Sequence, residues 1–159
     1  MPLIRAFCIT GLLAVSTAPA FAASYGPELQ GFEYPYPLKH FEFQSQGKSL
    51  QMGYMDVPAK GQANGRSVVL MHGKNFCGAT WEGSIKALSD AGYRVIAPDQ
   101  IGFCSSSKPD HYQYSFQQLA TNTHQLLEKL GIQKATVIGP STGGQHAHRY
   151  ARLNPEPPE

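Results

Sequence analysis

The chain has 159 residues, of which 42% are hydrophobic and 15% charged, a balance typical of a globular protein with a packed core. Its 13 basic and 11 acidic residues give a formal net charge of +2, and no run of Lys or Arg indicates a nucleic-acid partner. No group of Cys and His residues has the spacing of metal ligands, so we expect neither a metal nor another cofactor.

The first 23 residues have the features of a secretory signal peptide. A short start containing Arg5 precedes an apolar run at residues 6–15, and small residues follow at 18–23. Cleavage after Ala22 fits the A-x-A pattern best, and cleavage after Ala20 is an alternative. Because the apolar run is too short to span a bilayer, we expect an exported protein, periplasmic or secreted, without a stable membrane anchor.

The segments that follow predict an irregular arm and then a β-hairpin. Pro and Gly residues punctuate residues 24–37, which we expect to lie on the domain without regular structure. Apolar residues alternate with polar ones on both sides of Gln46-Gly47-Lys48, as in two strands joined by a tight turn. A polar loop at residues 58–66 leads into the next strand.

Short apolar strands then alternate with amphipathic helices as far as residue 153. Strands are predicted at 67–71, 93–97 and 135–139, and helices around 81–91, over 116–130 and from the turn after residue 139 to 153. This alternation indicates an α/β domain, in which a mostly parallel sheet with helices on both faces follows the leading hairpin. The last residues, 154–159, predict an unstructured tail.

One stretch has the pattern of a nucleophile turn. The β-branched strand ends in Gly139-Pro-Ser141-Thr-Gly143, a G-x-S-x-G pattern that is followed by a helix. A catalytic serine must be held exposed beside a base, and a sharp strand-to-helix turn with small residues two positions before and after it can do so. The structural alternative is a glycine-rich connection with an idle serine. Loops that begin at His72 and Asp99 are expected at the same carboxyl edge of the sheet, where ligands bind in such folds.

Three motifs occur in the order found in one known family: His72-Gly73 after a strand, Pro98-Asp99 followed by Gly102 and Lys108-Pro109, and the serine turn with Gly144. The chain therefore resembles the α/β-hydrolase fold superfamily, and more narrowly the bacterial hydrolases of its fold-1 group. The resemblance covers residues 38–153, which we interpret as the N-terminal portion of such a domain.

The resemblance implies a role for each matching residue. Ser141 would be the nucleophile, and backbone N–H groups of Thr142 and of Lys74 or Asn75 would form the oxyanion hole. The remaining motif residues would be structural: His72, Gly73, Asp99, Gly139 and Gly143. Two residues depart from the family pattern, because Pro140 replaces the usual His before the nucleophile and Thr142 a frequent Met after it.

The expected base and acid of a catalytic triad are missing. In this fold they follow the serine in the chain, but only 18 residues follow Ser141 and none is Asp. The downstream histidines, His146 and His148, lie in the helix that begins at the serine, so we interpret them as polar helix positions instead of bases. The resemblance also implies later strands beside the one at 135–139, and without them that strand would form an edge with its apolar faces partly bare.

The sequence therefore predicts an exported serine hydrolase that cleaves an ester, thioester or amide of a small-molecule acyl substrate through an acyl-serine. As these 159 residues alone it is expected to be truncated and inactive. A serine at the turn disfavours epoxide or dehalogenase chemistry, which in this fold uses a carboxylate nucleophile. The alternative is a non-catalytic remnant, or an α/β domain that binds a ligand or partner. Cys77 and Cys104 are either a disulfide between two loops or two buried thiols.

Overall fold

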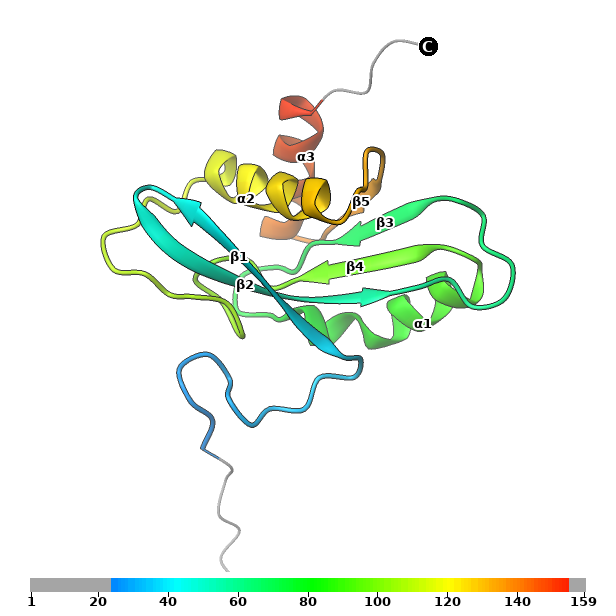
Figure 1. Ribbon diagram of the computed structural model, residues 1–159, viewed down its shortest axis with the longest axis horizontal. Coiled ribbons are helices and arrows are strands. Elements are labelled where there is room, and N and C mark those ends of the chain that lie inside the picture. The colour runs from blue at the N-terminus through cyan, green and yellow to red at the C-terminus, as the bar shows by residue number, and fades with distance from the viewer. Residues whose placement is uncertain (1–23, 155–159) are drawn as a thin grey trace, which may run out of the picture.

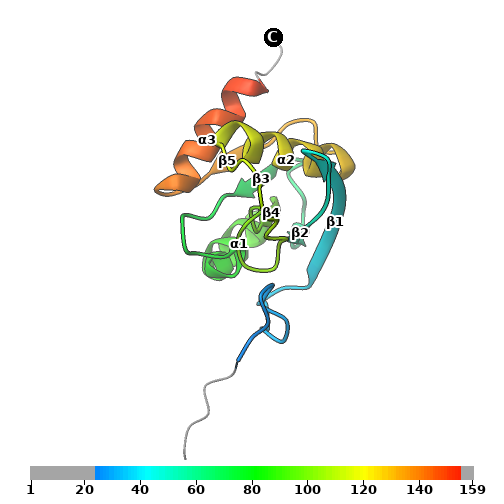
Figure 2. The ribbon, with the colours of Figure 1, turned by 90° about the vertical axis from the view of Figure 1, so that its left-hand side faces the viewer.

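The computed structural model describes residues 24–154, so the predicted signal peptide with its cleavage site, and most of the predicted tail, lie outside the described residues. Within them a single sheet separates one helix from two others (Figures 1 and 2). In chain order the elements are β1 (Leu38–Ser45), β2 (Lys48–Val57), β3 (Ser67–Leu70), the short 3-10 helix η1 (Gly78–Trp81), α1 (Glu82–Asp90), β4 (Arg94–Pro98), α2 (Phe116–Lys129), β5 (Thr136–Ile138) and α3 (Thr142–Leu153). Every helix and strand expected from the sequence is present.

The sheet is mixed and has the order β1-β2-β4-β3-β5. Strands β3, β4 and β5 are parallel, with Val69 opposite Ile96 on one side and Val137 on the other. The hairpin strands are antiparallel to each other, and β2 is antiparallel to β4. Gln46 and Gly47 at the hairpin turn both have positive φ angles, 51° and 70°, which match the twist of a tight two-residue turn.

Two hydrophobic clusters, one on each face of the sheet, confirm the prediction of helices on both faces. On one face α1 contributes Ile85, which packs with Val68, Leu70 and Val95. On the other face α2 and α3 cover a larger cluster that contains Met52, Val69, Met71, Ile96, Leu119, Leu126, Leu127 and Tyr150. The clusters alternate along each strand because successive side chains point to opposite faces.

The strand that leads to the serine lies at the edge of the sheet. β5 pairs with β3 only, and the side chain of Ile138 is 42% exposed. The prediction of a partly bare apolar edge strand is confirmed for this part of the chain. Among residues 24–154 there is no helix with the length and apolar character needed to cross a membrane.

Candidate active site

Three loops meet at the carboxyl edge of the parallel strands. They follow β3 at Met71–His72, β4 at Asp99 and β5 at Gly139. The first and third loops are in contact, because a Cβ atom built on Gly73 would lie 3.7 Å from the Cβ of Ser141. The expectation that these loops lie together at one edge agrees with the structure.

Ser141 occupies a sharp and strained turn between β5 and α3. Its φ of 51° and ψ of −123° are sparsely populated for a residue with a side chain, and its side chain is exposed. The flanking glycines make the turn possible. A Cβ on Gly139 would lie 2.4 Å from the carbonyl carbon of Gly143, and a Cβ on Gly143 would lie 2.3 Å from the carbonyl oxygen of Met71. Neither position has room for a side chain, which gives the G-x-S-x-G pattern its physical reason.

His72 is locked in place by both nitrogens of its ring. Its Nδ1 donates to the carbonyl oxygen of Gly73 at 2.8 Å, and its Nε2 accepts the backbone N–H of Gln100 at 2.9 Å. Burial lowers the pKa of His72, against the opposing effects of the Gly73 carbonyl and the Asp99 carboxyl. A neutral ring with both nitrogens occupied cannot take a proton from Ser141, so His72 joins two loops instead of acting as a base.

His146 faces the interior, and the interpretation of this residue as a polar helix position is wrong. Its side chain is 4% exposed, and its ring meets that of Phe116 edge-on at 5.0 Å between centroids. Among the described residues its Nδ1 has no hydrogen-bond partner. Burial, with a smaller effect of His72, lowers its pKa to about 4, so it is neutral near pH 7. The prediction of a helix at this position is confirmed, but α3 packs this face against α2. His148 is exposed, as expected.

Of the residues expected to form the oxyanion hole, Thr142 directly follows the serine and binds Lys74. The backbone N–H of Lys74 donates to the hydroxyl oxygen of Thr142 at 2.6 Å. Asn75 has a φ of 66°, which marks a tight bend in the same loop. Thr142 begins α3, and the first N–H groups of a helix have no partner within the helix. The Lys74–Thr142 hydrogen bond thus brings this loop to the first residue of α3, with its backbone N–H and its hydroxyl.

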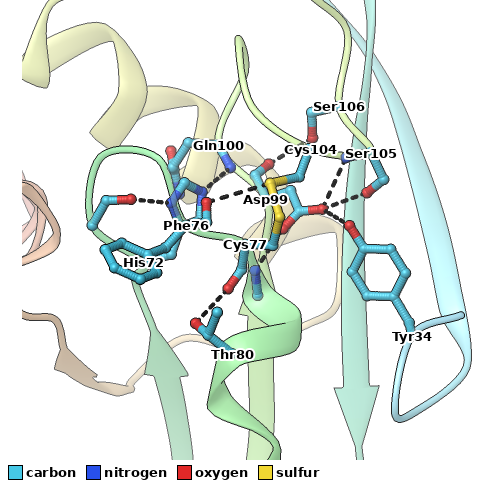
Figure 3. Close-up of a disulfide and its surroundings, with 12 residues drawn as sticks. Tyr34, His72, Phe76, Cys77, Thr80, Asp99, Gln100, Cys104, Ser105 and Ser106 are labelled. Carbon is cyan, nitrogen blue, oxygen red and sulfur yellow. Dashed lines mark hydrogen bonds between the residues drawn. A yellow bond between two sulfur atoms is a disulfide. The ribbon is translucent and has the colours of Figure 1, made fainter. Parts of the chain in front are cut away.

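The side chain of Asp99 links the loops that follow β3 and β4 by hydrogen bonds (Figure 3). It is 1% exposed, and its Oδ1 accepts the N–H of Gly78 at 2.6 Å. Its Oδ2 accepts the N–H and the hydroxyl of Ser105, at 3.0 and 2.6 Å, and the hydroxyl of Tyr34 from the N-terminal arm. Burial and the hydrogen bond to Asp99 raise the pKa of Tyr34. The carboxyl group is therefore a structural anchor, as the family resemblance implies.

A disulfide joins the same two loops. Cys77 precedes Gly78, Cys104 precedes Ser105, and the structure bonds the two sulfur atoms. Each cysteine is thus next to a residue whose N–H binds Asp99, so a covalent and a hydrogen-bonded link act side by side (Figure 3). Of the two readings left open by the sequence, the structure contains the disulfide.

The described residues contain one cluster of three side chains of metal-binding type. The ligand atoms of Cys77, Asp99 and Cys104 lie within 4.8 Å of one another. In the disulfide, however, the sulfur atoms are bonded to each other and are not thiolates, and thiolates are the form that binds metals. In this form the cluster lacks the ligands for a metal.

A cavity of about 370 Å³ opens between the first loop and the start of α2. Phe103, Tyr114, Phe116 and Leu119 give it apolar walls, and Lys74, Thr142 and His146 lie along the rest. Small-molecule sites are commonly of this size and largely apolar, with a few polar groups that set orientation. Two of the residues expected to form the oxyanion hole, Lys74 and Thr142, line this cavity.

The family assignment rests on a sequence profile as well as on this geometry. The profile described as "alpha/beta hydrolase fold" matches residues 66–157, which is more than half of the chain. The chain belongs to the α/β-hydrolase fold family. The sequence of this chain is 40% identical over 103 residues to that of the AB hydrolase superfamily protein YfhM of Bacillus subtilis. The match covers 64% of this chain and 36% of that protein.

Solved structures agree with the assignment. A probable hydrolytic enzyme from Pseudomonas aeruginosa PAO1 is 63% identical with a TM-score of 0.80, over 82% of this chain and 42% of that one. Epoxide hydrolase A from Mycobacterium thermoresistibile is 30% identical with a TM-score of 0.63, over 76% of this chain and 36% of that one. The chain thus spans less than half the length of these relatives.

Sequence reasoning missed three features of the site. Tyr34 reaches Asp99 across 65 positions, His146 faces inward, and the Thr142 hydroxyl engages Lys74 N–H. The family motifs give no signal for Tyr34, because its partner is defined only by tertiary folding. Helical periodicity could have found His146, since it lies four residues before the buried Tyr150 on the same helix face.

Proposed function

We propose that this protein is a serine hydrolase that cleaves an ester, thioester or amide of a small acyl substrate through an acyl-serine. The observation that carries the proposal is the strained turn of Ser141 at the carboxyl edge of the sheet. The turn is flanked by two glycines at positions with no room for a side chain. The family assignment and a carboxylesterase neighbour, 32% identical with a TM-score of 0.63, support it. A serine at this position favours acyl transfer over epoxide opening.

The proposed reaction has two halves. The oxygen of Ser141 attacks the carbonyl carbon while a base takes its proton, and the resulting oxyanion is stabilised by N–H donors. Collapse of this intermediate breaks the bond to the leaving group, which receives the proton, and water then hydrolyses the acyl-serine by the same steps. In this proposal the backbone N–H of Thr142, at the start of α3, is one such donor, and the loop of Gly73–Asn75, which lies against the serine turn, contributes to the others.

We further propose that the base and its acid partner come from polypeptide other than these 159 residues. His72 is fully hydrogen-bonded, and His146 is buried against Phe116 with its pKa lowered to about 4. No hydrogen bond of the described residues involves the Ser141 hydroxyl as donor. On this proposal, the 159-residue chain can bind and react with a strong electrophile but does not turn over a substrate.

A fluorophosphonate probe with intact-mass and peptide-map readout tests the proposal. We expect Ser141 to be labelled, the matched variant Ser141→Ala to be unlabelled, and hydrolysis of a short-chain 4-nitrophenyl ester to show no difference between the two. A folded but unlabelled wild-type chain would favour the alternative, an α/β domain that binds a ligand or partner without catalysis. Ser141-dependent turnover would contradict the proposed need for an external base.

Export of the protein is a separate part of the proposal. The signal-like residues 1–23 support it, and so does the Cys77–Cys104 disulfide, because disulfides persist in oxidising compartments. Expression in a Gram-negative host should yield periplasmic protein whose intact mass corresponds to a chain beginning at Ala23. Recovery of the full-length chain in the cytoplasmic fraction alone would exclude export by this signal.

A further inference from the structure

The backbone N–H of Lys74 does not point freely into the site. It donates to the hydroxyl oxygen of Thr142 at 2.6 Å, across 68 positions of the chain. A donor that is already satisfied cannot serve an oxyanion unless that hydrogen bond breaks. In this structure the Lys74 donor is therefore occupied by the Thr142 hydroxyl.

The hydroxyl keeps its own proton available. A threonine hydroxyl has one O–H donor and two lone pairs, and the Lys74 N–H uses a lone pair. The hydrogen bonds found within residues 24–154 include none that the Thr142 hydroxyl donates. Both residues line the 370 Å³ cavity, together with Gly73, which adjoins the Cβ of Ser141. A group bound in that cavity lies where this proton can reach it.

The histidines in the cavity wall supply no positive charge that could stabilise an oxyanion. The two histidines in its wall, His72 and His146, have lowered pKa values because they are buried, so they carry no positive charge near pH 7. The ammonium group of Lys74 belongs to an exposed side chain. Among residues 24–154, the groups of this cavity wall that can stabilise a developing negative charge are therefore N–H and O–H dipoles that are already in place.

We propose that the Thr142 hydroxyl is itself an oxyanion-hole donor, and that Lys74 N–H acts through it. The hydroxyl accepts a hydrogen bond from Lys74 and donates one to the carbonyl oxygen of the substrate, beside the backbone N–H of Thr142. The proton stays on the threonine oxygen throughout, and no covalent bond to Thr142 forms. Chains of hydrogen bonds polarise one another, so the Lys74 N–H makes the hydroxyl a stronger donor. This inference rests on the proposed serine-hydrolase function.

The test compares two reagents that differ in one atom. A fluorophosphonate carries a P=O oxygen that accepts hydrogen bonds in the oxyanion hole, whereas its P=S analogue carries a sulfur that accepts them weakly. The two labelling rates at Ser141 are measured by intact mass between pH 7 and 10. Their ratio reports the contribution of the oxyanion hole alone, because any base accelerates both reactions equally. Thr142→Val removes the hydroxyl at nearly constant shape, and Thr142→Ser retains it.

We expect Thr142→Val to lower the P=O preference by about 10²-fold, the effect of removing one oxyanion donor, and Thr142→Ser to keep most of it. The amide of Lys74 should also lose protection from hydrogen exchange in Thr142→Val only. An unchanged preference in a labelled Thr142→Val chain would overturn the hydroxyl's role and leave the serine hydrolase standing. No labelling of wild-type Ser141 by either reagent would overturn both. Should Thr142→Val not fold, a wild-type preference no larger than that of a simple alcohol in solution would overturn the inference.

Discussion

Asp99 and Ser141 follow strands on either side of β3, at the same edge of the sheet, and their surroundings are opposite. Asp99 is buried, accepts four hydrogen bonds from three segments of the chain and lies beside a disulfide. Ser141 is exposed, strained in its backbone and without a side-chain cap on its own helix. The contrast shows that one edge of the sheet holds both a strained, exposed serine and a buried carboxyl group whose hydrogen bonds link the loops after β3 and β4.

The largest expected effect on stability comes from replacing Asp99, the hydrogen-bonded residue of this comparison. Asp99→Ala leaves the N–H groups of Gly78 and Ser105 buried without an acceptor, each at about 1–3 kcal/mol, so we expect the free energy of unfolding in urea to fall by more than about 3 kcal/mol. Asp99→Asn keeps one acceptor oxygen and should lose less. Replacement of the exposed Asp90 by Ala is the control, with little change expected. A loss below about 1 kcal/mol in Asp99→Ala would contradict the anchoring role.

Removal of the covalent link comes next. The disulfide closes a segment with a sequence separation of 27, and constraint of the unfolded chain by such a loop contributes about 3 kcal/mol. Replacing Cys77 and Cys104 together by Ser should lower the free energy of unfolding by about this amount, measured against the oxidised wild type. Wild type treated with a dithiol reductant should match the double variant. Equal stability of the oxidised and reduced chains would argue against a structural role for the disulfide.

Because His146 is buried, we expect the free energy of unfolding to depend on pH. Because its folded pKa of about 4 lies below the ordinary histidine pKa of 6.5, the unfolded chain binds a proton between these pH values that the folded chain does not. The free energy of unfolding should therefore fall by about 2–3 kcal/mol from this group as the pH drops from 6.5 to 4. His146→Leu should flatten this part of the profile, and the exposed control His148→Leu should not. Identical slopes in wild type and His146→Leu would rule out this source.

The smallest expected effect tests the crowding of the serine turn. Gly143→Ala would place a Cβ 2.3 Å from the Met71 carbonyl oxygen, so the turn must shift, at about 1–3 kcal/mol in unfolding free energy. Ser141 labelling by the fluorophosphonate should slow as well. Gly83→Ala is the matched control in α1, where nothing lies within 4 Å, and it should stabilise the helix by about 0.5–1 kcal/mol. If both variants behaved alike, close packing would not explain the glycine.

The sequence by itself determined the order of the elements and the residue types at the turn. Period-two and period-3.6 patterns are local properties of the chain, so they predict the buried strands and α2 to within a residue or two, and the hairpin by its turn. The sequence indicates Gly139 and Gly143 because a strand-to-helix turn needs small residues. The structure gives the physical reason, since backbone atoms lie too close to both positions for a Cβ atom. The edge position of β5 is an expectation that comes from the family resemblance and not from a local pattern of the chain.

Only the tertiary structure decided which polar atoms meet. Tyr34 reaches Asp99, the N–H of Lys74 reaches Thr142, and both His72 nitrogens are occupied by the backbones of two loops. The inward position of His146 likewise depends on α2 lying across α3. These contacts join segments far apart in the chain, and their partners are fixed by the packing of the sheet and helices, which no local pattern encodes.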